Sequence, residues 1–206
     1  MTRLLPGVLA MTLVVVAANI LVQFFVGDWL TWGAFVYPFA FLVTDVMNRV
    51  YGASTARRVV IVGFIVGVIC SFIGTQFLGE FGPLVTLRIA LGSGIAFLTA
   101  QLLDVAVFDR LRDGSWWRAP LVSTFVGSTV DTAIFFFIAF SAAASGLLGT
   151  DHNTEFFNEV VATPFGTDLV RWIGTAGVDW CVKIAIALIA LVPFRLIVRR
   201  IQTSAA

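Results

Sequence analysis

The feature that most constrains the fold is a succession of apolar stretches, each close to the length that crosses a lipid bilayer. A membrane-spanning helix needs about 20 mostly apolar residues, because the hydrocarbon core is about 30 Å thick and a helix rises about 1.5 Å per residue. Six segments approach that length: Val8–Val26, Leu30–Asn48, Val59–Gly79, Leu87–Phe108, Leu121–Ser145 and Leu169–Phe194. The sequence therefore predicts an all-α membrane protein, a bundle of about six transmembrane helices that forms a single domain over residues 1–206.

Charge is scarce along the whole chain. Hydrophobic residues make up 59% of the sequence and charged residues 12%, whereas a soluble domain carries roughly 25% charged residues. This small number of charges cannot cover a water-facing surface. Much of the surface is therefore expected to face the lipid bilayer. The net charge is +1, and no basic stretch could follow a phosphate backbone, which argues against a nucleic-acid partner.

The first two apolar stretches differ from the others. The first is preceded by Arg3, and a signal peptide also has a basic residue before its apolar core. Its apolar run, however, is longer than the usual signal-peptide core of about 7–15 residues. We therefore interpret it as a retained helix. The second is interrupted by Pro38 and ends with Asp45 and Asn48, and proline removes a backbone donor and disturbs the preceding turn. A bent or broken helix is predicted there.

The distribution of basic residues predicts the orientation. If the N-terminus is cytoplasmic, ten basic residues fall on the cytoplasmic side: Arg3, Arg49, Arg57, Arg58, Arg110, Arg112, Arg118, Arg195, Arg199 and Arg200. The opposite side holds only Arg88 and Arg171, and Lys183 lies within the last apolar stretch. Because positive charge is retained in the cytoplasm during insertion, this split predicts an inner-membrane protein with both termini cytoplasmic. The longest outward loop, over residues 146–168, is expected to form a short surface helix or a lid.

Four aspartates interrupt the apolar helices, and they are the first candidates for function. They are Asp45, Asp104, Asp131 and Asp179. A charged residue at the centre of a membrane helix costs about 2.5–3.5 kcal/mol on translocon-based scales. Such residues are expected to face the bundle interior or a wet cavity, so we interpret them as candidate substrate- or proton-binding groups.

Each aspartate shares a helix face with another polar residue three or four positions away. The partners of Asp45, Asp104, Asp131 and Asp179 are, in that order, Asn48, Gln101, Ser128 and Lys183. These eight residues form the predicted substrate-binding set. A structural ion pair is an equal alternative for Asp179 and Lys183, and a helix cap beside Arg49 is the alternative for Asp45.

Several kinds of chemistry lack the residues they require. His152 has no second ligand nearby, and Cys70 and Cys181 lie in apolar runs, so no metal and no cofactor are expected. Lys183 is the only lysine and no phosphate-binding loop precedes it, so any ATP-driven transport would need a separate ATPase partner. No catalytic motif of a hydrolase or metalloprotease appears, and the protein is not expected to be an enzyme. The Gly63–Gly67 spacing leaves a homodimer open.

Polar blocks at fixed places in the apolar helices carry a family resemblance. They are the T-D-x-x-N block at Thr44–Asn48, followed by Ala56–Arg58, the Q-x-x-D-V block at Gln101–Val105, the run Asp131–Phe135, and Trp180–Lys183 with Pro193 downstream. In this order, from about residue 10 to 200, the chain resembles the queuosine precursor transporter family, also called the vitamin-uptake-transporter-like family. One departure is Ser128, where this family is expected to favour glutamine.

The resemblance implies uptake of 7-cyano-7-deazaguanine, 7-aminomethyl-7-deazaguanine or both, the precursors of a modified tRNA base. It also implies a six-helix fold akin to the substrate-binding subunits of energy-coupling-factor vitamin transporters. The alternative is a subunit that binds another planar vitamin-like solute and works with a separate ATPase module. The residues suit such ligands, because a carboxylate can accept two adjacent N–H donors and aromatic side chains can stack on a flat ring.

Overall fold

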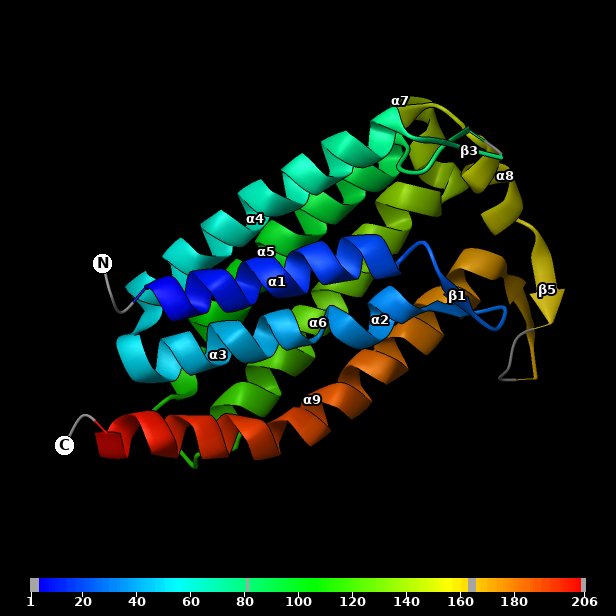
Figure 1. Cartoon of the computed structure of the whole chain (residues 1–206). Helices are drawn as coiled ribbons and strands as arrows, with labels where there is room; N and C mark the ends of the chain where they lie inside the picture. The colour runs from blue at the N-terminus through cyan, green and yellow to red at the C-terminus, as the bar shows by residue number, and fades with distance from the viewer. Residues whose placement is uncertain (1–3, 81, 163–165, 205–206) are drawn as a thin grey trace.

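The computed structural model describes residues 4–80, 82–162 and 166–204. The helices that build its bundle are α1 (Leu5–Leu21), α2 (Trp32–Val36), α3 (Phe39–Tyr51), α4 (Ala53–Gln76), α5 (Leu87–Leu111), α6 (Arg118–Phe140) and α9 (Arg171–Ser204). They pack side by side and run in alternating directions, with α2 and α3 following one another as one interrupted crossing (Figure 1). The start of α1 and the end of α9 lie at the same end of the bundle.

Short elements occupy the opposite end of the bundle (Figure 1). Among the described residues they are three antiparallel hairpins and three short helices. The hairpins pair β1 (Phe25–Val26) with β2 (Leu30–Thr31), β3 (Leu78–Gly79) with β4 (Gly82–Pro83), and β5 (Val160–Ala162) with β6 (Asp168–Val170). The short helices are η1 (Ala142–Ala144), α7 (Ser145–Leu148) and α8 (His152–Phe157). The loop over residues 146–168 thus contains a short helix, as one of the two readings of the sequence predicted.

The predicted membrane segments are only partly continuous helices. Within the described residues, four helices are long and apolar enough to cross a membrane: α4, α5, α6 and α9. Helix α1 is also apolar but has only 17 residues. The predicted second span is broken: α2 ends at Val36 and α3 begins at Phe39. Pro38 has no backbone N–H to continue the hydrogen-bond ladder, which explains the break. The helical class and the predicted break are confirmed, but the predicted count of about six membrane-spanning helices is not.

The outer surface of the bundle is apolar, and its interior holds polar side chains among apolar ones. Large apolar side chains are exposed along α4 and α9, including Ile65, Phe72, Ile189 and Val192. Aspartate, asparagine, glutamine and lysine side chains are buried between the helices instead. An apolar outer surface around buried charged and amide side chains suits a lipid environment, in which polar groups must be satisfied within the protein.

Glycine permits close helix packing inside the chain. A Cβ atom added at Gly63 would lie 2.6 Å from Cγ of Met11, so glycine lets α4 approach α1. This residue of the Gly63–Gly67 pair therefore serves packing within one chain. At the end of the bundle where α1 starts, Arg112 donates from Nη2 to the carbonyl of Asn48 at 2.9 Å, and Arg49 donates to the carbonyl of Arg112.

Candidate functional site

All eight residues that the sequence nominates are buried, and the structure divides seven of them into two groups. The first group contains Asp131, Asp179 and Lys183. With Tyr37 and Thr132, which contact them, these residues are here called the lysine cluster. The second group contains Asp45, Asn48, Gln101 and Asp104. With Thr44, Ser123 and Thr124, these residues are here called the inner polar cluster. Ser128 lies on α6 between Thr124 and Asp131, one turn from each.

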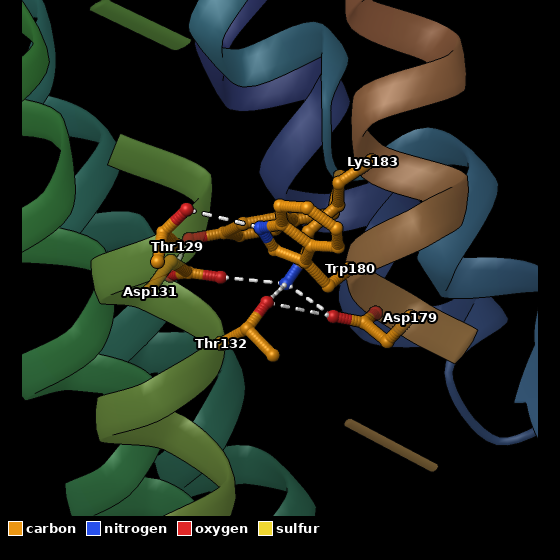
Figure 2. Close-up of polar contacts among 7 residues, drawn as sticks. Thr129, Asp131, Thr132, Asp179, Trp180 and Lys183 are labelled. Carbon is orange, nitrogen blue, oxygen red and sulfur yellow. Dashed lines mark hydrogen bonds and ion pairs between the residues drawn. The ribbon is translucent and has the colours of Figure 1, made fainter. Parts of the chain in front are cut away.

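The lysine cluster joins α6 to α9. The ammonium group of Lys183 lies 2.8 Å from Oδ2 of Asp131 and 2.6 Å from Oδ2 of Asp179, and it donates to Oγ1 of Thr132 at 3.0 Å. Figure 2 shows the two carboxylates converging on this ammonium from different helices. The pairing of Asp179 with Lys183 along one helix face is confirmed, and the structure adds Asp131 as a second carboxylate on the same lysine.

The interrupted crossing also reaches the lysine cluster. Tyr37, which lies between α2 and α3, donates its hydroxyl to Oδ1 of Asp131 at 2.8 Å. The ammonium of Lys183 lies 5.3 Å from the centre of the Tyr37 ring. Thr132 donates to Oδ2 of Asp179 at 3.0 Å. Sequence reasoning missed the roles of Tyr37 and Thr132, because their partners are far away along the chain.

The lysine cluster uses its hydrogen-bonding capacity internally. An ammonium has three N–H donors, and the three contacts of Lys183 to Asp131, Asp179 and Thr132 account for all of them. Both oxygens of Asp131 have partners, one in Tyr37 and one in Lys183. This arrangement braces α6, α9 and the turn between α2 and α3, and it leaves little capacity for a ligand in this conformation.

The inner polar cluster lies between α3, α5 and α6. Ser123 and Thr124 of α6 each donate to one oxygen of Asp45, both at 3.2 Å. Oγ1 of Thr44 lies 2.6 Å from Oε1 of Gln101, and Nδ2 of Asn48 donates to the carbonyl of Val105 at 3.0 Å. The Asn48 amide is thereby turned so that its oxygen points away from Val105.

Several polar atoms of this region have no partner. Among the described residues, no hydrogen bond reaches Oδ1 of Asn48, Nε2 of Gln101, Oγ of Ser128 or either oxygen of Asp104. Leaving a buried polar group unsatisfied costs about 1–3 kcal/mol. The carboxyl of Asp104 also lies against that of Asp45, so the two repel each other unless a proton or the donors of a ligand lie between them. Such a set of open groups is typical of a binding site rather than a brace.

Close packing of α5 against α6 positions Asp104. A Cβ atom added at Gly127 would lie 2.7 Å from the Phe41 ring, 3.3 Å from the carbonyl of Ala100 and 3.4 Å from Cβ of Asp104. Glycine therefore allows α6 to approach the helix that carries Asp104 and Gln101. The cavity that reaches Asp45 is small, about 10 Å³, and it is bounded by Pro38 and by residues of α3, α6 and α9 that include Phe41, Pro120 and Phe194. This space is too small for a planar ring system.

Other features lie outside both clusters. A hollow of about 510 Å³ between the β1–β2 hairpin and α9 is lined mainly by apolar residues and contacts neither cluster. Arg88, which the sequence assigns to the non-cytoplasmic side, is 2% exposed. It donates to the carbonyls of Ile138, Ser141 and Gly149 and to the hydroxyls of Ser145 and Thr154. These bonds hold η1, α7 and α8 against the ends of α5 and α6.

Known proteins resemble the chain over most of its length. The family model described as "Putative vitamin uptake transporter" matches residues 31–198. The "Queuosine precursor transporter" of Escherichia coli (strain K12) is 35% identical over 195 residues, which cover 88% of this chain and 79% of that protein. The "Probable queuosine precursor transporter" of Haemophilus influenzae (strain ATCC 51907 / DSM 11121 / KW20 / Rd) is 35% identical over 189 residues, which cover 84% of this chain and 72% of that protein. No solved structure matches the chain.

The sequence resemblance and these similarities agree on the family. The match includes all the helices that carry the two polar clusters, from the turn before α3 to α9. The apolar outer faces of those helices suit a protein that crosses the membrane several times. The chain therefore belongs to the queuosine precursor transporter family, a family of multi-pass membrane transporters rather than enzymes.

Proposed function

We propose that the protein imports queuosine precursors, 7-cyano-7-deazaguanine or 7-aminomethyl-7-deazaguanine or both, and that the inner polar cluster binds them. The names of the similar proteins support the substrate class. The observation that carries the site is the set of buried polar atoms without partners on Asn48, Gln101 and Asp104. Three of these atoms are carboxylate or amide oxygens, which accept hydrogen bonds, and one is an amide nitrogen, which donates.

This set of groups matches the edge of a guanine-like ring. That edge presents adjacent N–H donors beside a carbonyl acceptor. The Asp104 carboxylate would accept from two adjacent donors, the Asn48 oxygen would accept from a further N–H, and the Gln101 amide would donate to the carbonyl. Phe41 borders the same region, at Gly127, and offers a ring for stacking. A ligand bound in this way would relieve the cost of the unsatisfied groups.

The proposal includes an inner-membrane location and six crossings with both termini in the cytoplasm. The interrupted pair α2–α3 counts as one crossing, and the ten-to-two division of arginines supports the orientation. We expect a phosphatase reporter fused after the C-terminus to be inactive and a fluorescent reporter there to be bright. A phosphatase fused at Gly149 is the matched control and should be active. Phosphatase activity at the C-terminus would contradict the orientation.

Uptake is tested in cells that cannot make the precursors. Such cells should recover the modified tRNA base when they carry this gene and receive either precursor at a limiting external concentration. The amount of modified base, measured by mass spectrometry of digested tRNA, is the readout, and cells with an empty vector are the control. Equal recovery with and without the gene would refute the import of these compounds.

A further inference from the structure

The lysine cluster has an unbalanced charge. Two carboxylates, Asp131 and Asp179, contact one ammonium, Lys183, and all three residues are buried. Among the residues that the structure describes, the other ionisable group that faces them is the Tyr37 hydroxyl, from the turn between α2 and α3. With all three charged groups ionised and Tyr37 neutral, the cluster carries one excess negative charge within the helix bundle. An uncompensated charge in this environment is costly, and one bound cation would remove it.

A proton fits this position better than a metal ion. The ammonium of Lys183 already occupies the point where the two carboxylates meet (Figure 2). A metal ion placed there would meet a positive charge at bonding distance. In the part of the chain that the structure describes, no group of three or more metal-ligating side chains is present either. Proton binding on a carboxylate requires no additional space.

The two carboxylates differ in their access to water. The side chain of Asp179 is 12% exposed and that of Asp131 is 5% exposed. Asp179 lies in the third turn of α9, whose start is at the end of the bundle opposite the start of α1. Both oxygens of Asp131 have partners, Tyr37 and Lys183, whereas Lys183 and Thr132 both contact Oδ2 of Asp179. Asp179 is therefore the carboxylate better placed to exchange a proton with the outer side.

The cluster contacts the helices that carry the inner polar cluster. Asp131 lies on α6, one turn from Ser128 and two turns from Thr124. Tyr37 directly precedes Pro38 and α3, which carries Asp45 and Asn48. A change of charge at Asp179 alters its bond from Thr132 of α6 and the ion pair of Lys183 with Asp131, which Tyr37 of this turn also contacts. Residues of α9 form part of the wall of the narrow space at Asp45. The opening of this space is thus linked to the charge of the lysine cluster.

We infer that Asp179 is the proton-binding residue of a proton-coupled importer, with the lysine cluster linking its protonation to the movement of α9. Substrate import proceeds together with proton entry: Asp179 takes up a proton from the outer side, the neutralised cluster loosens α9, and the proton leaves toward the cytoplasm. This inference rests on the proposed uptake function, and its experiment separates the two.

The decisive variant is Asp179→Asn. It keeps the shape of the side chain and leaves Lys183 and Asp131 as a balanced pair, so we expect it to fold and to bind substrate. The full-length protein is reconstituted in liposomes, and uptake of labelled 7-cyano-7-deazaguanine is followed with the interior more alkaline than the exterior. With coupling to one proton, the wild type should accumulate the compound up to about tenfold per pH unit of gradient. A protonophore should abolish this accumulation.

The Asp179→Asn variant should equilibrate the compound across the membrane without accumulating it. Asp168→Asn, an exposed aspartate on β6, is the matched control and should accumulate the compound as the wild type does. Accumulation by Asp179→Asn equal to that of the wild type would overturn the assignment. Equilibration by the wild type without accumulation would overturn proton coupling but leave the proposed import function intact.

A measurement without substrate keeps the inference testable even if the import function is wrong. Infrared difference spectra between acidic and alkaline pH should show the band of a protonated carboxyl group in the wild type. The same band should be reduced in Asp179→Asn and retained in Asp168→Asn. An unchanged band in Asp179→Asn would overturn the inference. If labelled 7-cyano-7-deazaguanine neither bound to the wild type or any variant nor crossed the liposome membrane through them, the result would count against the proposed function only.

Discussion

Replacing Lys183 with methionine is expected to destabilise the protein by about 3–5 kcal/mol, because it removes the single cation from a buried group of two carboxylates. The remaining charges of Asp131 and Asp179 would lie close together inside the bundle. Asp179→Asn should have a much smaller effect, since it leaves one carboxylate for one ammonium. Thermal unfolding of the detergent-purified variants, together with their yield from the membrane, measures both effects.

The charge balance also predicts how the variants combine. Lys183→Met together with Asp179→Asn leaves Asp131 charged with only the Tyr37 hydroxyl as partner, so recovery should be incomplete. Adding Asp131→Asn should restore much of the remaining loss, because no buried charge is then uncompensated in the cluster. Arg199→Met removes an exposed positive charge from the same helix and is the matched control. A stability loss for Asp179→Asn as large as that for Lys183→Met would contradict this account.

Replacing Asp104 with asparagine is expected to reduce uptake at limiting substrate by about 10- to 100-fold while leaving stability unchanged or raising it. Among the described residues no well-aligned hydrogen bond reaches either oxygen of Asp104, and its neighbours Ser123 and Asp45 make only weak contacts with it, so little internal bonding is lost. The asparagine amide places an N–H donor where the carboxylate had an acceptor, so it faces an N–H of the ligand and one hydrogen bond is lost. A hydrogen bond to a charged group is worth about 1.5–3 kcal/mol. Initial uptake rates and thermal unfolding of the same variant measure the two effects.

A brace at Asp104 would behave in the opposite way. If this aspartate held the helices together, Asp104→Asn would lower the unfolding temperature and the amount of protein together with the uptake. Asp109→Asn is the matched control on the same helix: its carboxylate pairs with Arg112, and its side chain is 41% exposed. Uptake by this control should stay near the wild-type rate. Normal uptake by Asp104→Asn at limiting substrate would remove Asp104 from the binding site.

Hydropathy and spacing were enough to predict the class of the protein and the side chains that face inward. Lipid cannot satisfy a charge, so each aspartate in an apolar stretch had to be buried, and the structure buries all eight nominated residues. The break at Pro38 follows from a missing backbone donor. The contact of Asp179 with Lys183 follows from the helical repeat, which places positions four apart on one face.

Only the tertiary structure decided which polar groups meet across helices. Lys183 and Asp131 are 52 positions apart, and Tyr37 and Asp131 are 94 apart, so no helical repeat relates them. Asp104 and Asp131 look alike in sequence, since each interrupts an apolar helix beside another polar residue. Packing gives Asp131 a lysine and a tyrosine but leaves Asp104 without a donor among the described residues. The difference between a brace and a binding group therefore depends on how the helices pack, because a hydrogen bond requires atoms within about 3 Å of each other.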